Sequence, residues 1–128
     1  MKLTTKIAML FLSLTLAFCT KTAITNEAGE SAQNANLLKT PAGIQEKIAA
    51  IKSNPKGRES ATLYSYTYKG RTVYLINAEC CDQFNYLYDE NGKEICAPSG
   101  GITGLGDGRC TDFFRERANA SLIWKDNR

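Results

Sequence analysis

The spacing of apolar residues changes from that of a helix to that of strands between residues 40 and 97. One apolar stripe recurs every three or four positions and predicts an α-helix over 40–53, with Ile44, Ile48 and Ile51 on one side. Thr40-Pro41 predicts its start, with Thr40 as N-cap and Pro41 in the first turn, where its missing N–H costs no hydrogen bond. Asn54-Pro55 predicts its end. The opposite side carries charged and amide side chains, so we expect this helix to pack on a sheet.

From Thr62 the period becomes two, which is typical of β-strands. Four strands are predicted, over residues 62–68, 71–78, 84–88 and 93–97. Lys69-Gly70 and 89–92 have the glycine and Asx chemistry of tight turns between antiparallel strands. Further along, 111–114 predicts a short helix or turn, and 121–124 is a candidate edge strand. A helix followed by a meander of about four strands predicts a small α+β domain, with the helix on one face of an antiparallel sheet.

Three tyrosines alternate along the first predicted strand, Tyr64, Tyr66 and Tyr68. Tyrosines at alternate strand positions form cross-strand pairs worth about 0.2–1 kcal/mol each, so one interpretation is structural. In the other, the helix covers only the side of Leu63 and Val73, and the tyrosines form an exposed binding surface for a saccharide, a peptide or another envelope protein. Periodicity does not tell which face the helix covers, so both interpretations stay open.

Four cysteines follow: Cys80, Cys81, Cys96 and Cys110. In an exported chain an even set predicts two disulfides, with three possible connectivities. Adjacent residues of an extended segment point to opposite faces, so we expect Cys80 and Cys81 to bond separately to Cys96 and Cys110 rather than to each other. Each disulfide contributes about 2–4 kcal/mol to a small domain. Adjacent cysteines fit the spacing of a zinc site poorly, and a redox switch would lack both Cys-x-x-Cys and a nearby His.

A loop over residues 98–108 contains five glycines, which predicts several backbone turns with positive φ. The loop lacks the Gly-Lys-Ser/Thr ending of a phosphate-binding loop. Cys96 and Cys110 lie on either side of it, so we expect a compact loop that is fixed at both ends.

Loops on a rigid scaffold often carry binding residues. We therefore take Asp82, Gly101, Gly104 and Asp107, together with the three tyrosines, as a candidate binding surface, and expect Asp82 and Asp107 to converge at the rim of the glycine loop. Isolated carboxylates fall short of the oxygen ligands that calcium requires. Neither a metal site nor a cofactor is predicted.

The first residues are basic, and an uncharged apolar run follows up to residue 19, which predicts a secretory signal peptide over residues 1–18. The run is too short to cross a bilayer, which takes about 20 apolar residues. Leu16–Cys19 resembles the lipobox of bacterial lipoproteins, so we expect Cys19 to become the acylated first residue, with a palmitate-like chain that holds the protein at a membrane. The alternative is cleavage near Ala23, which discards Cys19.

Residues 19–39 are rich in Thr, Ala, Asn, Glu and Ser and predict a flexible tether, which leaves 40–128 as the single domain. Loss of Lys2 and Lys6 with the signal peptide lowers the net charge from +3 to +1. Basic and acidic residues are interspersed along the rest of the chain. Nucleic acid is therefore not an expected partner.

The cysteine and glycine pattern resembles that of a family of short exported lipoproteins from Gram-negative bacteria, whose domain has no known function. The resemblance covers about residues 41–128 and rests on Glu79–Asn85, Leu87–Asp89, Gly92, Ile95–Pro98, Gly100–Gly104, Gly106–Gly108, Cys110 and Ile123–Lys125. It implies export and a lipid anchor. It supplies no activity and no catalytic residue.

The chain contains no histidine, which excludes His-based triads and His general acid–base catalysis. We therefore expect a protein that is not an enzyme, a binding or structural domain anchored in the cell envelope, on the periplasmic face or the cell surface. One alternative is an extracytoplasmic enzyme inhibitor that presents the loop Gly101–Arg109. Another is a metal- or redox-responsive protein that uses Cys80 and Cys81.

We predict that the native protein, extracted from membranes, starts at Cys19 and carries added acyl mass. The other four cysteines should alkylate only after reduction, because all four are expected in disulfides. Intact mass under denaturing, non-reducing conditions, repeated after reduction and alkylation, measures both properties. A lipid-free species with freely alkylating thiols would contradict both the anchor and the disulfide scaffold.

Overall fold

The computed structural model describes residues 27–128. The predicted signal peptide, the predicted lipidation site Cys19 and the first part of the predicted tether lie outside the described residues. In the part of the chain that the structure describes, no helix is long and apolar enough to cross a membrane.

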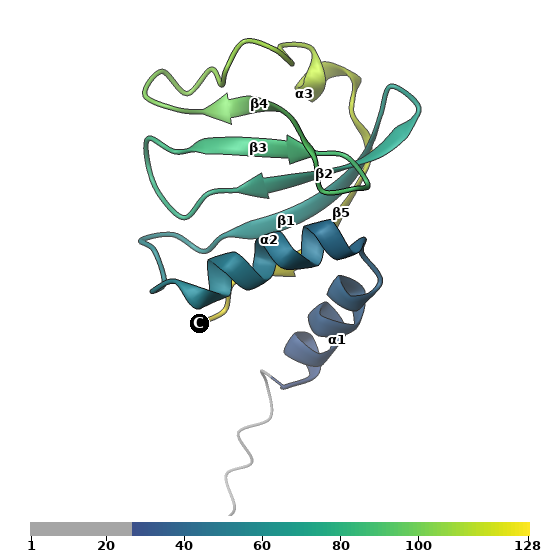
Figure 1. The fold of residues 1–128 in the computed structure, drawn as a ribbon, viewed down its shortest axis with the longest axis vertical. Helices are drawn as coiled ribbons and strands as arrows, with labels where there is room; N and C mark the ends of the chain where they lie inside the picture. Colours follow the sequence, from purple (N-terminus) through teal and green to yellow (C-terminus); the bar gives the residue numbers. More distant parts are fainter. Residues whose placement is uncertain (1–26) are drawn as a thin grey trace, which may run out of the picture.

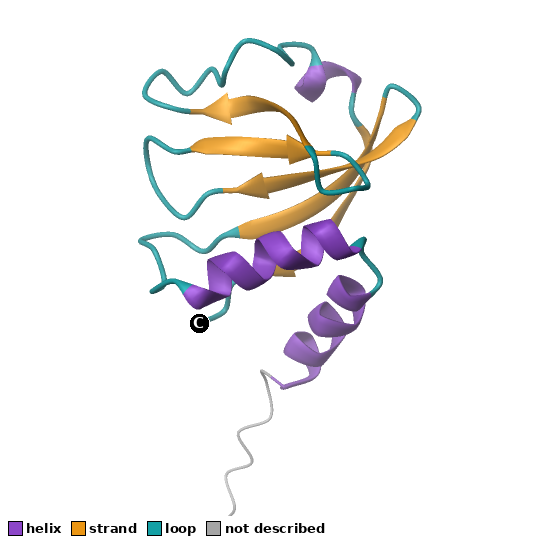
Figure 2. Cartoon of the chain, in the orientation of Figure 1, coloured by secondary structure: helices purple, strands orange, loops and turns teal. Residues whose placement is uncertain are grey.

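The described residues form three helices and one five-stranded sheet (Figure 1, Figure 2). In chain order they are α1 (Glu27–Leu38), α2 (Ala42–Ser53), β1 (Thr62–Tyr68), β2 (Arg71–Asn77), β3 (Phe84–Tyr88), β4 (Glu94–Gly100), α3 (Phe113–Glu116) and β5 (Ala118–Lys125). Neighbouring strands are antiparallel, in the order β4-β3-β2-β1-β5. The α+β class is confirmed, with five strands instead of about four because β5 adds a full strand beside β1.

One face of the sheet packs against α2. The predicted stripe supplies this contact: Ile44 and Ile48 are 0% and 1% exposed, and they join a cluster with side chains from four strands, namely Leu63, Tyr74, Ile76, Tyr88 and Trp124. The register accounts for this set, because residues directly opposite in an antiparallel pair share a face, as Tyr74 and Tyr88 do. In Figure 1, α2 runs across β1 and leaves β3 and β4 in view above it.

The other face carries the tyrosines of β1. Tyr66 pairs with Val73, so Val73 lies on the tyrosine side and its predicted place beside Leu63 was wrong. Tyr66 and Tyr68 are 7% and 6% exposed, and the ring of Phe113 in α3 meets both edge-on at centroid distances of 5.4 and 5.2 Å. Such pairs contribute about 0.5–1.5 kcal/mol each. The exposed-surface interpretation of Tyr66 and Tyr68 is therefore replaced by the structural one.

Residues 27–38, expected within a flexible tether, form helix α1 instead. Leu37 packs against the cluster under α2, and the Gln33 side chain accepts a hydrogen bond of 3.4 Å from the backbone of Lys125 in β5. The start of α2 also differs by one residue from the prediction. Pro41 is the N-cap, while the Thr40 hydroxyl donates to the Leu37 carbonyl at 2.7 Å and closes the end of α1.

A contact between two glycines sets the position of α2 on the sheet. Gly43, in the first turn of α2, lies against the turn between β3 and β4, where Gly92 has φ 75°. A Cβ on Gly43 would lie 3.1 Å from the Gly92 Cα and closer still to the Asn91 carbonyl oxygen. This close approach of two backbones is possible because neither glycine has a side chain.

We predict that Gly43→Ala destabilises the protein by about 1–3 kcal/mol, because the added methyl group meets a backbone that cannot move aside. Glycine-to-alanine changes inside helices normally stabilise by about 0.5–1 kcal/mol. Gly29→Ala in α1 is the matched control, since nothing lies within 4 Å of its would-be Cβ, and it should be neutral or stabilising. Urea unfolding of both variants provides the test, and a more stable Gly43→Ala protein would contradict this packing.

Candidate binding groove

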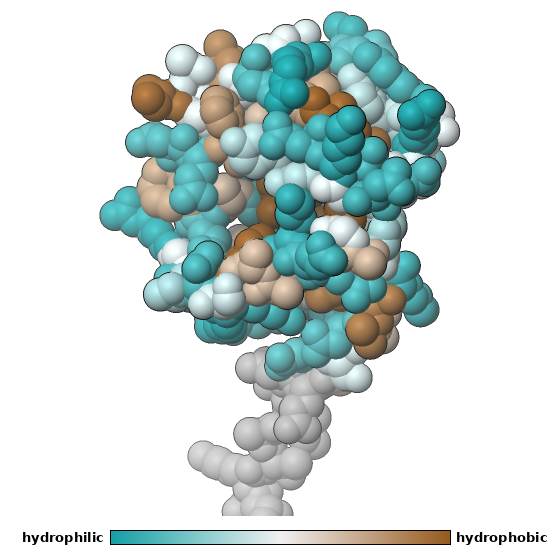
Figure 3. Space-filling view, in the orientation of Figure 1, coloured by the Kyte–Doolittle hydropathy of each residue, from teal (hydrophilic) through white to brown (hydrophobic). Residues whose placement is uncertain are grey.

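A groove of about 510 Å³ lies between α2 and the part of the sheet that α2 leaves uncovered. Aliphatic side chains line one part of it, including Ile51 of α2 and Ile76 of β2, and three aromatic residues of β3 line another: Phe84, Tyr86 and Tyr88. Its volume falls in the range of ligand-binding pockets. On the face of the molecule in Figure 3, the surface is hollowed between α2 and the strands, with apolar groups at depth. We call this site the α2–β3 groove.

The aromatic wall of the groove is a row of tilted rings rather than a flat surface. Phe84 and Tyr86 are 5.9 Å apart at 60°, and Tyr86 and Tyr88 are 6.3 Å apart at 51°. Lys47 of α2 lies 5.1 Å above the Tyr88 ring. Burial, with smaller effects from Glu94 and Tyr86, raises the pKa of Tyr88 to about 12, so this phenol stays neutral and available as a donor.

Glu79 lines the groove next to Asn54 at the end of α2. Its carboxylate accepts a 3.1 Å hydrogen bond from the Gly57 backbone through Oε2, while Oε1 is buried without a hydrogen bond and lies 3.5 Å from the Arg128 guanidinium. Gly57 is required here, because a Cβ would meet the Glu79 side chain. The ion pair compensates the charge of Glu79 but leaves one acceptor unsatisfied.

Arg128 joins this end of the groove to the C-terminus of α2. Its guanidinium donates to the carbonyls of Ile51, Lys52 and Asn54 at 3.3, 2.8 and 2.7 Å. The last carbonyls of a helix lack partners within the helix, so these bonds add to the one that the Ile51 carbonyl accepts from the Asn54 N–H. It also forms two parallel hydrogen bonds with Asp126, which is 1% exposed. The end of α2 is therefore held by a bidentate charged pair.

The disulfide pairing predicted from the sequence was wrong. Cys80 bonds to its neighbour Cys81, and Cys96 bonds to Cys110. The prediction assumed an extended chain, but the segment is a β-turn in which the Gln83 N–H donates to the Cys80 carbonyl at 3.2 Å and Cys81 has φ 46°. Two adjacent cysteines in this turn no longer point to opposite faces.

The Cys96–Cys110 disulfide belongs to the core on the tyrosine face. Cys96 is 0% and Cys110 6% exposed, and both pack in one cluster with Leu87 and Phe113. Their Cα atoms are 6.0 Å apart. The bond joins β4 to the segment after the glycine loop, which confirms the expectation that the loop is fixed at both ends.

The predicted residues of the glycine loop shape the loop rather than form a site. Asp107 accepts hydrogen bonds from the Ala97 and Arg109 backbones at 2.9 and 3.0 Å and from the Arg109 side chain at 2.6 Å. Partial burial raises its pKa, but these bonds outweigh the effect and lower the pKa below the usual value. Gly101 lies against the ring of Phe84, and Gly104 has open space around its Cα.

Of the seven predicted binding residues, the groove includes only Asp82. The expected convergence of Asp82 with Asp107 gains no support, because the hydrogen bonds of Asp107 go to Ala97 and Arg109. Tyr64 is half-buried beside the core of the tyrosine face. Sequence reasoning missed the wall Phe84–Tyr88 as a site, although its alternating aromatics were the available signal.

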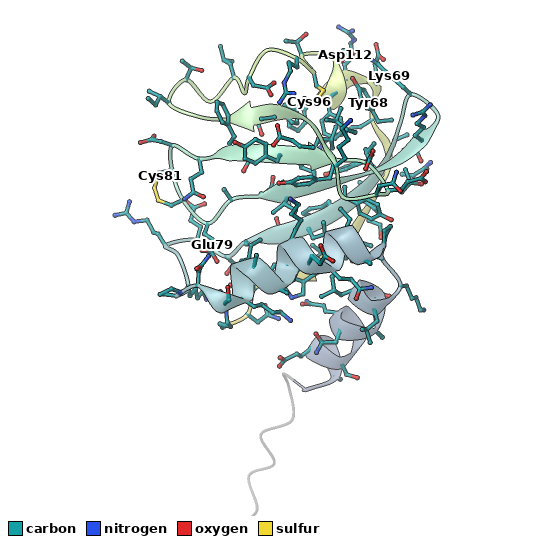
Figure 4. All side chains as sticks on the ribbon, in the orientation of Figure 1. Tyr68, Lys69, Glu79, Cys81, Cys96 and Asp112 are labelled. Carbon is teal, nitrogen blue, oxygen red and sulfur yellow. A yellow bond between two sulfur atoms is a disulfide. The ribbon has the colours of Figure 1, made fainter. Side chains whose placement is uncertain are left out.

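A charged cluster at the β1–β2 turn has a structural role. Asp112 accepts hydrogen bonds from the Tyr68 hydroxyl at 2.6 Å and from Lys69 at 2.7 Å, and Figure 4 shows the three side chains together beside α3. The bond from Lys69, then that from Tyr68, lowers the pKa of Asp112 to about 2. The cluster fastens α3, and with it Phe113, over the tyrosine face.

Residues 49–126 match the profile of DUF6970, a domain of unknown function. This match confirms the expectation of a family whose function is unknown. No curated protein and no solved structure matches the chain.

We predict that protonation of Asp126 weakens the fold in acid. The hydrogen bonds from Arg128 lower its pKa to about 2, against about 4 in an unfolded chain. A lowered pKa stabilises the fold above pH 4, and this contribution is lost as the pH falls from 4 to 2. Asp126→Asn should lower the free energy of unfolding at pH 7 by roughly 1–2 kcal/mol, a value reduced to allow for the partial exposure of Arg128. It should also flatten the acid limb, which is the part of the stability curve below pH 4.

Urea unfolding between pH 7 and pH 2 measures this effect. Arg128→Gln is the companion variant and should flatten the same limb, because it removes the partner of the same carboxylate. Acid limbs that run parallel in the wild type and both variants would contradict the assignment.

Proposed function

The chain belongs to the family defined by the DUF6970 domain, and we propose that it is a non-catalytic binding domain of the bacterial cell envelope whose α2–β3 groove takes an extended peptide segment of another envelope protein. The observation that carries this proposal is the tilted aromatic row of β3, which lines one groove together with aliphatic side chains of α2 and of the neighbouring strand β2. Protein interfaces favour this combination of aromatic core and polar rim.

The tilt of the rings favours a peptide over a saccharide. A sugar ring stacks on a flat aromatic face, whereas rings inclined at 60° and 51° form notches. A notch between tilted rings accommodates an apolar side chain. Alternate side chains of an extended peptide repeat at roughly 6.6 Å, which is close to the ring spacings of 5.9 and 6.3 Å along β3.

Polar groups at the rim supply hydrogen bonds for a peptide backbone. Asn54, Asp82 and Gln83 line the groove, and Asp82 and Gln83 are exposed. Main-chain amides and carbonyls of a bound segment need such partners, because a buried polar group without one costs free energy. Lys47 lies over Tyr88 at the wall and closes one side of the site.

We also propose that a lipid on Cys19 anchors the protein. The support is the lipobox-like Leu16–Cys19 and the apolar run before it. The domain presents α1 and the glycine loop at opposite ends (Figure 1). An anchor that precedes α1 would leave the groove accessible from the envelope space.

Catalysis and loop-type inhibition have less support than peptide binding. The chain has no His, and the charge of Glu79 in the groove is compensated by Arg128. An inhibitor loop must present an extended segment to a protease, whereas Gly101, Gly104 and Gly106 each have φ 73° and turn the backbone sharply. In residues 27–128 no group of three or more Cys, Asp or Glu residues is placed to hold a metal.

We predict that phage display of random seven-residue peptides on the purified full-length protein enriches sequences with alternating aromatic or aliphatic residues. Synthetic copies of an enriched peptide should bind at least tenfold more weakly to Phe84→Ala, because that change removes one side of a notch. Titration calorimetry on wild type and variant measures the affinities.

Phe114→Ala is the matched control, since Phe114 is 45% exposed and Phe84 37%, but only Phe84 lines the groove. The control should keep wild-type affinity. Failure to enrich any peptide, equal losses in both variants, or a cell-wall oligosaccharide that binds in place of the peptides would each overturn the proposal.

A further inference from the structure

The turn that carries the Cys80–Cys81 disulfide is continuous with the lining of the α2–β3 groove. Glu79 precedes the disulfide, and Asp82, Gln83 and Phe84 follow it, and all four line the groove. The hydrogen bond from Gln83 N–H to the Cys80 carbonyl closes the turn at 3.2 Å. A change of conformation at the two cysteines therefore moves residues of the groove.

Both ends of this segment are fixed to the rest of the domain. The Glu79 carbonyl accepts a 2.7 Å hydrogen bond from Glu59, and the Gln83 carbonyl accepts a 3.0 Å bond from Gly101. Between these points, no backbone bond to another element is formed by Cys81 or Asp82. The disulfide is thus the main restraint on the conformation of the turn.

Cys81 has a backbone conformation that is unfavourable for a residue with a side chain. Its φ of 46° lies in the left-handed region, which glycine adopts freely and residues with a side chain disfavour. Cys81 has this conformation while it is bonded to its neighbour Cys80. Once the bond opens, the backbone of Cys81 is free to return to negative φ, and the Cys80–Gln83 turn opens with it.

The two disulfides differ sharply in access. Cys81 is exposed and points away from the body of the domain in Figure 4, whereas Cys96 is buried beside α3 and is 0% exposed. Thiol–disulfide exchange needs an attacking thiolate to reach a sulfur atom. An added thiol therefore reaches Cys80–Cys81 and leaves Cys96–Cys110 intact.

We propose that Cys80–Cys81 is a thiol–disulfide exchange site through which an extracytoplasmic protein dithiol controls the α2–β3 groove, an inference that rests on the proposed peptide-binding function. A thiolate of the dithiol attacks Sγ of Cys81, the Cys80–Cys81 bond breaks, and a mixed disulfide forms. The second thiolate of the dithiol then displaces Cys81. The two cysteines gain two electrons and two protons, and the dithiol is oxidised to its own disulfide.

The disulfide form is the binding-competent form. In this state the turn places Asp82 and Gln83 at the rim, and Phe84, which follows it, forms part of the aromatic wall. Reduction relaxes the turn, displaces the rim and lowers the affinity for peptide. The core disulfide and the sheet stay intact, so the groove changes while the domain remains folded.

The first measurement treats the full-length protein with increasing concentrations of dithiothreitol and follows alkylation by mass spectrometry. Two thiols, assigned to Cys80 and Cys81, should appear before those of Cys96 and Cys110. Amide hydrogen exchange in the same samples should show loss of protection at Gln83 and retained protection at Asp107, whose N–H donates to the Ala97 carbonyl at 2.9 Å. This readout needs no ligand.

The second measurement is the affinity for a peptide enriched on the wild-type protein. We expect at least a tenfold loss on selective reduction and recovery on reoxidation. Cys80→Ser with Cys81→Ser should bind weakly at any concentration of reductant. Cys80→Ser with Cys81→Gly should bind more tightly than the double serine variant, with an affinity that reductant does not change, because glycine adopts positive φ at no steric cost.

The outcomes separate the two proposals. Loss of Cys96–Cys110 before Cys80–Cys81, or unchanged Gln83 exchange after selective reduction, overturns the redox site whether or not a peptide binds. Peptide binding that is indifferent to reduction overturns it as well and leaves the groove in place. Failure to obtain any peptide, with Gln83 exchange sensitive to reduction, overturns the peptide function while the exchange site at Cys80–Cys81 stands.

Discussion

Burial of both faces of a single sheet is the constraint on which the structure depends. α2 covers one face with Ile44 and Ile48, while the other is covered by Phe113 and by the Cys96–Cys110 disulfide. A single helix is too narrow to cover five strands, so α2 covers the β1 side as far as Tyr88 and leaves Phe84 and Tyr86 of β3 partly exposed. The groove is therefore a direct consequence of packing one helix on a wide sheet.

The position of that helix is determined at its two ends. At the N-terminal end Gly43 meets the β3–β4 turn backbone to backbone, and at the C-terminal end Arg128 binds the last carbonyls of α2 and lies 3.5 Å from Glu79. Neither contact is hydrophobic. Apolar burial holds α2 against the sheet, and these two contacts set where on the sheet it lies and thus how wide the groove is.

The sequence allowed correct prediction of elements whose signals are local. The Ile44–Ile51 stripe and the alternation from Thr62 predicted α2 and the meander because side-chain periodicity follows backbone geometry directly. Contacts that depend on three-dimensional placement were not predictable. Val73 was assigned to the wrong face, α1 was taken for a tether because its composition is polar, and the disulfides were mispaired because the Cys80–Gln83 segment turns instead of extending. The groove was missed for the same reason, since it needs α2 and β3 placed together.

One disulfide stabilises the whole fold, and the other restricts the conformation of a single turn. Cys96–Cys110 closes the glycine loop and fills the core beside Phe113, so it contributes through buried area and through restriction of the unfolded chain. Cys80–Cys81 links adjacent residues and closes no loop of the chain. It therefore restricts the entropy of the unfolded chain very little and adds almost nothing to the stability of the fold. What it restricts is the backbone of one exposed turn at positive φ. The Cys80–Cys81 bond therefore acts on local conformation rather than on global stability. The segment whose conformation it restricts is the turn at the rim of the α2–β3 groove.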